Sequence, residues 1–137
     1  MPHDPEFVAE TRSWLVKARA DIRLAEIVQK EDASLRGDAL FHCQQAAEKV
    51  LKAYLTWNGR TFRKTHSIGE LGLAVVELAP TLEPLLRRAV TLTDYAWKFR
   101  YPGDVEEPST EEMTLALALA REVHDIIVAA LPVDVHP

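Results

Sequence analysis

Several features that define common protein classes are missing from this sequence. It has one cysteine, Cys43, so no disulfide can form within the chain, and no apolar run approaches the roughly 20 residues of a membrane-spanning helix. The first residues, MPHDPEF, lack the basic-then-apolar order of a secretory signal. We therefore expect a soluble, cytoplasmic protein that does not associate with membranes.

Positive charge is also scarce. Sixteen Lys and Arg residues stand against 21 Asp and Glu, and the net charge of −5 has the wrong sign for a protein that coats nucleic acid through charge alone. The segment GRTFRK, residues 59–64, is an exception because it holds three cations in six positions. A local basic site therefore stays open, although a solvated loop has the same composition.

The sequence lacks the patterns of metal sites and phosphate-binding loops. None of the five histidines stands four residues from another His or Cys, the spacing that puts two ligands on one helix face. There is no glycine-rich phosphate loop and no G-x-S-x-G nucleophile turn. We predict no metal and no cofactor.

Helical periodicity, by contrast, runs through nearly the whole chain. Asp4 followed by Pro5 is typical of a helix start, and Ser109 with Glu112 forms a capping box. Gly59 and Pro80 are stop signals. Together with the apolar stripes, these signals predict helices over about residues 5–30, 34–57, 66–79, 81–99 and 109–130.

No stretch alternates with period two for long enough to predict a strand, and the loops between the helices are short. Short loops favour antiparallel neighbours. We therefore predict an all-α fold, an up-and-down antiparallel bundle of four main helices with a short fifth at residues 66–79. One domain is expected over residues 1–137, with residues 130–137 as a flexible tail.

Two glutamines occupy an unexpected place in the second helix. On a helical projection Gln44 falls on the apolar stripe with Leu40, Ala47 and Leu51, and Gln45 lies beside it. A buried amide without partners costs about 1–3 kcal/mol, so these side chains need polar neighbours. We expect Gln44, Gln45 and Ala47 to lie at a seam between helices or at a dimer contact. A tightly packed contact within the bundle is the alternative.

Candidate ligand-binding residues lie mainly around the segment WKFRYPG. Arg100 offers a guanidinium that can bind a phosphate with two hydrogen bonds, and Tyr101 offers a ring on which a base can stack. The additional candidates are Lys49, Lys52 and His66. Simpler interpretations remain open, because Arg100 is equally suited to end a helix or to pair with Asp94 or Glu107, and His66 to cap a helix.

The second, fourth and fifth predicted helices carry apolar residues beyond one narrow stripe, more than one bundle of this size is expected to cover. Phe41, Tyr95, Trp97 and Phe99 are among these extra residues. A homodimer would bury this surplus.

The sequence resembles the HEPN domains (higher eukaryotes and prokaryotes nucleotide-binding). The resemblance rests on Trp14 to Ala25, on FHCQQAAEKVLKAYL at 41–55, on Gly59, on Thr65-His66 with Leu71, and on Arg100-Tyr101-Pro102. It implies a small, usually dimeric helical bundle similar to nucleotidyltransferase substrate-binding domains. It also implies a stand-alone nucleotide- or nucleic-acid-phosphate-binding protein that pairs with a minimal nucleotidyltransferase in a toxin–antitoxin module.

Many HEPN proteins are metal-independent RNases that use an Arg and a His separated by four to six residues. Here Arg100 is present, but residues 105–107 are Val, Glu and Glu, so the histidine is missing from the family position. The spacing recurs as Arg36…His42 and Arg60…His66, although about one such match is expected by chance. Enzymatic activity is therefore left open, and an RNase toxin that uses Arg100 and His66 is the alternative function.

Overall fold

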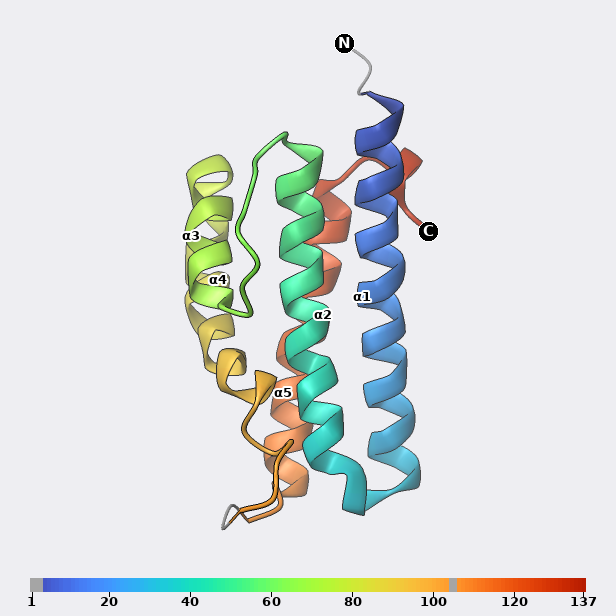
Figure 1. The fold of residues 1–137 in the computed structure, drawn as a ribbon, viewed down its shortest axis with the longest axis vertical. Helices are drawn as coiled ribbons and strands as arrows, with labels where there is room; N and C mark the ends of the chain where they lie inside the picture. The colour runs from blue at the N-terminus through green and yellow to red at the C-terminus, as the bar shows by residue number, and fades with distance from the viewer. Residues whose placement is uncertain (1–3, 104–105) are drawn as a thin grey trace.

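The computed structural model of this chain describes residues 4–103 and 106–137. Within these residues the chain contains five α-helices and no strand (Figure 1), which confirms the all-α bundle. The helices are α1 (Pro5–Glu31), α2 (Arg36–Trp57), α3 (Ile68–Leu78), α4 (Glu83–Ala89) and α5 (Thr110–Ala130).

Both predicted helix starts are confirmed by their capping bonds. The side chain of Asp4 accepts a hydrogen bond from the backbone N–H of Glu6, and Pro5 occupies the first turn, where no backbone donor is needed. Ser109 accepts from the N–H of Glu112 at 3.0 Å. Short-range chemistry therefore sets where α1 and α5 begin.

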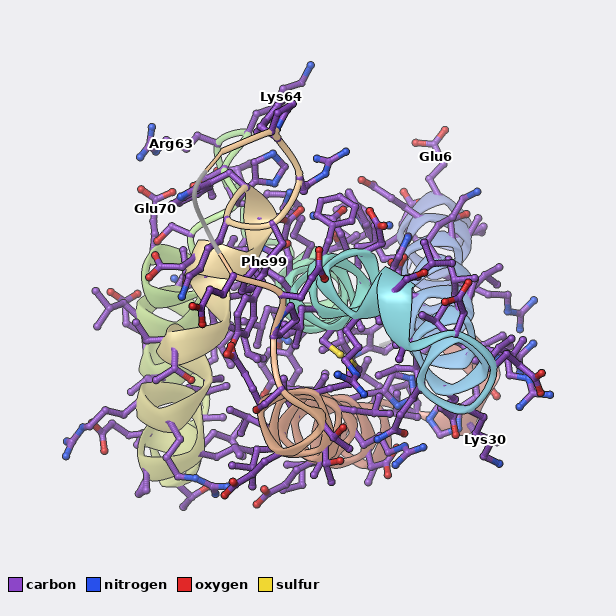
Figure 2. All side chains as sticks on the ribbon, turned by 90° about the horizontal axis from the view of Figure 1, so that it is seen from below. Glu6, Lys30, Arg63, Lys64, Glu70 and Phe99 are labelled. Carbon is purple, nitrogen blue, oxygen red and sulfur yellow. The ribbon has the colours of Figure 1, made fainter. Side chains whose placement is uncertain are left out.

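Helix α2 is the centre of the bundle. Seen along the bundle axis, α1, α5 and α3 lie on three sides of it (Figure 2), and 15 of its 22 residues are buried. Four alanines on this helix, Ala39, Ala46, Ala47 and Ala53, are fully buried in the core. Because alanine has a small side chain, neighbouring helices can approach the α2 backbone closely at these positions.

The connection between α2 and α3 departs from a simple up-and-down order. Residues 58–67 leave the end of α2 and run back along it, so α3 starts beside the middle of α2 and points in the same direction (Figure 1). A hydrogen bond from the Gln44 side chain to the carbonyl of His66, at 2.9 Å, fixes this placement. A short loop would have produced an antiparallel pair here instead.

The fourth helix is shorter than its apolar stripe predicts. Helix α4 ends at Ala89, and a 3₁₀ helix, η3, continues from Val90 to Ala96. Thr91 lies at the transition, where its hydroxyl donates to the carbonyl of Arg88 at 2.9 Å. Such side-chain bonds to the backbone compete with the regular α-helical pattern.

The segment after α5, for which the sequence predicts a flexible tail, lies against α1. It contains a 3₁₀ helix, η4 (Val133–Val135), and the side chain of Val135 is fully buried. Arg12 donates to the carbonyl of Asp134, and His136 hydrogen-bonds to the carbonyl of Val128 at 2.8 Å. The periodicity of α5 ends before this segment, so the sequence pattern did not reveal its packing.

Candidate functional site

The carboxylate of Glu48 lies at the centre of a buried polar cluster between α2 and the returning connection. Its Oε1 accepts from Gln44 Nε2 at 3.1 Å, from Gln45 Nε2 at 3.4 Å and from His66 Nδ1 at 2.7 Å. Its Oε2 accepts from Lys52 Nζ at 2.9 Å. We call these five residues the Glu48 cluster.

The side-chain amide nitrogens of both glutamines are hydrogen-bonded inside this cluster. Gln44 is completely buried, and its Nε2 donates both to Glu48 and to the backbone carbonyl of His66. Gln45 Nε2 donates to Gln44 Oε1 at 2.8 Å. Gln44 thus joins α2 directly to the returning connection, Gln45 supports it from the same helix, and Ala47 packs in the core beside them.

His66 is the most accessible member of the Glu48 cluster. Its side chain is 61% exposed, whereas that of Glu48 is only 4% exposed. A hydrogen bond from Nδ1 to a carboxylate orients the ring and, in the neutral imidazole, leaves Nε2 as the proton acceptor. The pair therefore has the arrangement of an oriented general base or acid.

A second carboxylate, Asp21 of α1, holds Lys49. Asp21 Oδ2 accepts from Lys49 Nζ at 2.7 Å, and Oδ1 lies 2.8 Å from His42 Nδ1. The Asp21 side chain is 8% exposed, so its carboxylate depends on the Lys49 ammonium and on the contact with His42 more than on water. Lys49 thus belongs to the α1–α2 contact and not to the Glu48 cluster.

Arg100 lies beyond the helix that it was predicted to end. Helix η3 stops at Ala96, and the guanidinium carbon of Arg100 lies 3.9 Å from the ring centroid of Phe41. Among the described residues Arg100 makes no ion pair, so the expected alternatives with Asp94 and Glu107 are not formed. Tyr101 follows it with 72% of its surface exposed.

The predicted residues Arg100, His66 and Lys52 line up along one side of α2. Arg100 contacts Phe41 and His66 contacts Glu48, while Lys52 is itself part of α2. Phe41, Glu48 and Lys52 are seven and four residues apart, which places them on one stripe of the helix. Segment 97–103 and Lys64 of the connection extend to this same side of the bundle (Figure 2). Lys49 faces Asp21 instead.

The upper end of this stripe contains a hollow of about 430 Å³, which we call the Lys52 pocket. Its lining residues come from α1, from the end of α2 and from the connection: Phe7, Glu10, Trp14, Lys52, Thr56, Gly59, Arg60, Thr61, Phe62 and Lys64. The sequence pattern singled out Lys52 and the basic segment, but it gave no indication that Trp14 lies beside them.

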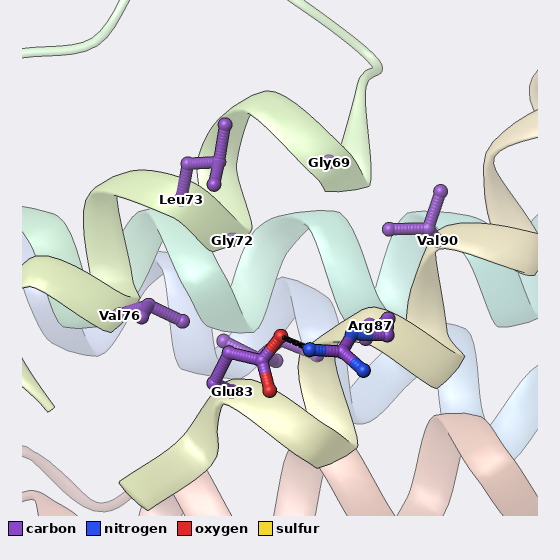
Figure 3. Close-up of a pocket in the computed structure, with 8 residues that line it drawn as sticks. Gly69, Gly72, Leu73, Val76, Glu83, Arg87 and Val90 are labelled. Atoms are coloured by element: carbon purple, nitrogen blue, oxygen red, sulfur yellow. Dashed lines mark hydrogen bonds and ion pairs between the residues drawn. The ribbon is translucent and has the colours of Figure 1, made fainter. Parts of the chain in front are cut away.

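Another hollow, of about 350 Å³, lies between α3 and α4 (Figure 3). Its walls are mainly apolar, with Leu73 and Val90 exposed at the rim, and Glu83 forms an ion pair with Arg87 on one side. No residue predicted for ligand binding lines this hollow. Its chemistry offers no proton donor or nucleophile beyond that ion pair.

Thiol chemistry is excluded at the single cysteine. Cys43 is fully buried in the core, and desolvation raises the pKa of its thiol to about 12. The thiolate, which is the reactive form, is therefore not populated near neutral pH. Within the part of the chain that the structure describes, no three His, Cys, Asp or Glu side chains are arranged to hold a metal ion.

The sequence reasoning missed Glu48 and Asp21, which organise both clusters. A signal for Glu48 existed, because Gln44, Glu48 and Lys52 follow one another at four-residue spacing on a stripe that is otherwise apolar. Asp21 likewise interrupts the buried stripe between Ala18 and Ile22 on α1. A charged residue on an apolar stripe requires a partner, and this requirement could have pointed to both.

Comparison with protein families finds that the HEPN domain profile matches residues 11–131, which is most of the chain. No curated protein and no solved structure matches the sequence. Among the described residues, no helix combines the length and the apolar character needed to cross a bilayer.

Proposed function

Because the chain belongs to the HEPN domain family, we propose that it is a stand-alone HEPN protein that binds nucleotide or nucleic-acid phosphate and acts with a minimal nucleotidyltransferase partner in a toxin–antitoxin pair. The observation that carries the binding proposal is the exposed guanidinium of Arg100, which lies over Phe41 and pairs with no carboxylate among residues 4–103 and 106–137. The partner is implied by the family resemblance.

Contact with an aromatic ring favours ligand binding by Arg100. The ring of Phe41 supports one face of the guanidinium and leaves its N–H edges available for two parallel bonds to a phosphate. Tyr101, the next residue, offers an exposed ring for a neighbouring base. A cation that served only to brace the fold would instead be expected to have a buried acidic partner.

The experiment compares Arg100→Ala and Arg100→Lys with wild type for binding of mononucleotides and short RNAs, alone and with any nucleotidyltransferase encoded beside it. We expect Arg100→Ala to weaken binding about 10-fold or more, and Lys to restore it only in part, because an ammonium lacks the planar fork. Arg87→Ala, which removes an exposed ion pair on α4, is the matched control. A large drop in melting temperature with unchanged binding would refute the proposal.

A second candidate function is a metal-independent RNase that uses His66 with Arg100. The Glu48–His66 bond favours it, because a buried carboxylate that orients an exposed imidazole is suited to proton transfer at the 2′-hydroxyl of RNA. RNA cleavage in excess chelator, lost in His66→Gln while RNA binding persists, would support this function. Absence of any cleavage by wild type, alone or after removal of its partner, would dismiss it.

We further propose that the protein forms a homodimer. Of the four aromatic residues expected to be in surplus, Trp97 stays 51% exposed, while Phe41, Tyr95 and Phe99 are half-buried within the chain. Leu73 and Leu115 add exposed apolar surface on α3 and α5. Light scattering at micromolar concentration should give twice the chain mass, and a monomer mass would count against the proposal.

A further inference from the structure

The Lys52 pocket is built from segments that are distant in the sequence. The first turns of α1 form one wall, and residues 59–62 and 64 of the connection form the other. Arg100 and Tyr101 do not line it, and its end of α2, at Thr56, lies about 22 Å along the helix from Phe41. It is therefore a different place from the Arg100 site.

Two aromatic rings form a corner in this pocket. Trp14 and Phe62 meet edge to face, with centroids 6.2 Å apart and planes at 63°. Phe7 adds a third ring that is 41% exposed, beside Gly59, whose φ of +69° lets the connection turn back at this point. Such rings offer apolar faces to a planar ligand ring.

Cations line the pocket in excess of carboxylates. Lys52 Nζ lies 5.4 Å from the centroid of Trp14 and 5.7 Å from that of Phe62, and its charge is balanced by Glu48. Arg60 and Lys64 lie at the rim, and Glu10 is the single carboxylate in the lining. This local balance is the reverse of the acidic balance of the whole chain.

The rim cations are available to a ligand. Arg60 pairs with Glu77 at 3.3 Å, but both side chains are about half exposed or more, so a phosphate can replace this carboxylate at little cost. Lys64 makes no ion pair with any described residue and projects from the bundle (Figure 2). Arg63, in the same segment, is occupied by Glu70 and does not line the pocket.

We infer that the Lys52 pocket binds one nucleotide, with its base against Trp14 and Phe62 and its phosphate between Arg60 and Lys64. The volume of about 430 Å³ falls in the range of small-molecule sites, about 300–1,000 Å³. The ligand class rests on the proposed function, whereas the place is independent of it. The nucleotide is either free or one unit of an RNA strand that continues along α2 toward Arg100.

The test measures binding of AMP, GMP, CMP and UMP by calorimetry and of a labelled RNA hexamer by fluorescence anisotropy. We expect the double variant Arg60→Gln, Lys64→Gln to weaken binding at least 10-fold, and Phe62→Leu about fivefold or more. Arg63→Gln removes one positive charge from the same segment, outside the pocket, and should stay within twofold of wild type. The two rim residues are exposed, so their variants should keep the melting temperature of wild type.

Mononucleotide binding that survives Arg100→Ala would identify a free nucleotide as the ligand, and binding of the hexamer alone would identify an RNA strand. Either result, with the expected order of variants, supports the pocket. If the rim variants bind like Arg63→Gln while Arg100→Ala loses binding, the pocket is refuted and the proposed function stands. If wild type binds none of these probes, both are refuted.

Discussion

The Glu48 cluster predicts an asymmetric response to mutation of its central ion pair. Glu48 and Lys52 are both buried, so their charges are stabilised by each other and by the hydrogen bonds of the cluster more than by water. Glu48→Gln removes the negative charge while keeping the volume, and it leaves the Lys52 ammonium with at most a neutral acceptor. Loss of one partner of a buried pair costs about 3–5 kcal/mol, and we expect about 3 kcal/mol because the new amide still accepts one bond.

Lys52→Met should cost less, about 1–2 kcal/mol. Glu48 then keeps its bonds from Gln44, Gln45 and His66, and a methionine side chain can still pack on Trp14 and Phe62. In the double variant Glu48→Gln, Lys52→Met, no buried charge is left unpaired. Its free energy of unfolding should therefore lie within about 1 kcal/mol of that of Lys52→Met.

Urea unfolding followed by circular dichroism at pH 7 measures these free energies, provided that the urea dependence of each variant stays the same. For a chain of this size, 3 kcal/mol corresponds to a melting temperature lower by about 12 °C. Glu83→Gln is the control, because it removes an exposed ion pair with the same spacing and should cost under about 0.5 kcal/mol. A larger loss for Lys52→Met than for Glu48→Gln would refute the reasoning.

Two further predictions concern other buried positions. Burial raises the pKa of the Cys43 thiol from 9.0 to about 12, so deprotonation favours the unfolded chain. The contribution of the protonated thiol to the free energy of unfolding is complete below pH 9 and is lost as the pH rises toward 12. Melting temperatures between pH 7 and pH 10.5 should therefore fall less in Cys43→Ala than in wild type, and an equal fall in both would contradict this origin. Gly37 packs against Phe99, and a Cβ at Gly37 would lie 2.6 Å from Phe99 Cβ. Gly37→Ala should therefore lower the free energy of unfolding in denaturant titration by about 1–2 kcal/mol, although alanine has the higher helix propensity. It should also weaken any ligand binding that depends on Arg100. A variant more stable than wild type would contradict this prediction and would show that segment 97–100 moves freely.

The sequence predicted the helices well where the signals are local. The caps at Asp4 and Ser109 and the apolar stripes depend on residues that are close together in the chain, so they can be recognised from the sequence alone. The course of residues 58–67 could not be predicted in this way, because it depends on bonds to Gln44 and Glu48 from the far end of the connection. The shortened α4 was missed because its apolar spacing continues through η3 although its hydrogen bonds do not.

The candidate site was predictable only in part. Residue type alone identified Arg100, Lys52 and His66 as candidates for ligand binding. The position of Gln44 and Gln45 on or beside an apolar stripe indicated that their amides need polar partners. The sequence did not predict which of these groups contact one another. Trp14 and Lys52, for example, are 38 positions apart in the sequence and become neighbours only because α1 packs antiparallel to α2 (Figure 1). The partners Glu48 and Asp21 were overlooked because acidic residues in helices are usually solvated.

The backward course of residues 58–67 makes the length of this connection part of the fold. From the end of α2 back to Gln44 the chain descends about 20 Å, and ten residues span at most about 33 Å, so the connection can lose about three residues before it becomes too short. Most surface loops tolerate insertion and deletion, but removing four or more residues here would start α3 higher along α2 and detach His66 from Glu48. Natural relatives with a shorter segment at this place should therefore lack the histidine–carboxylate pair, even where both residue types persist in the alignment.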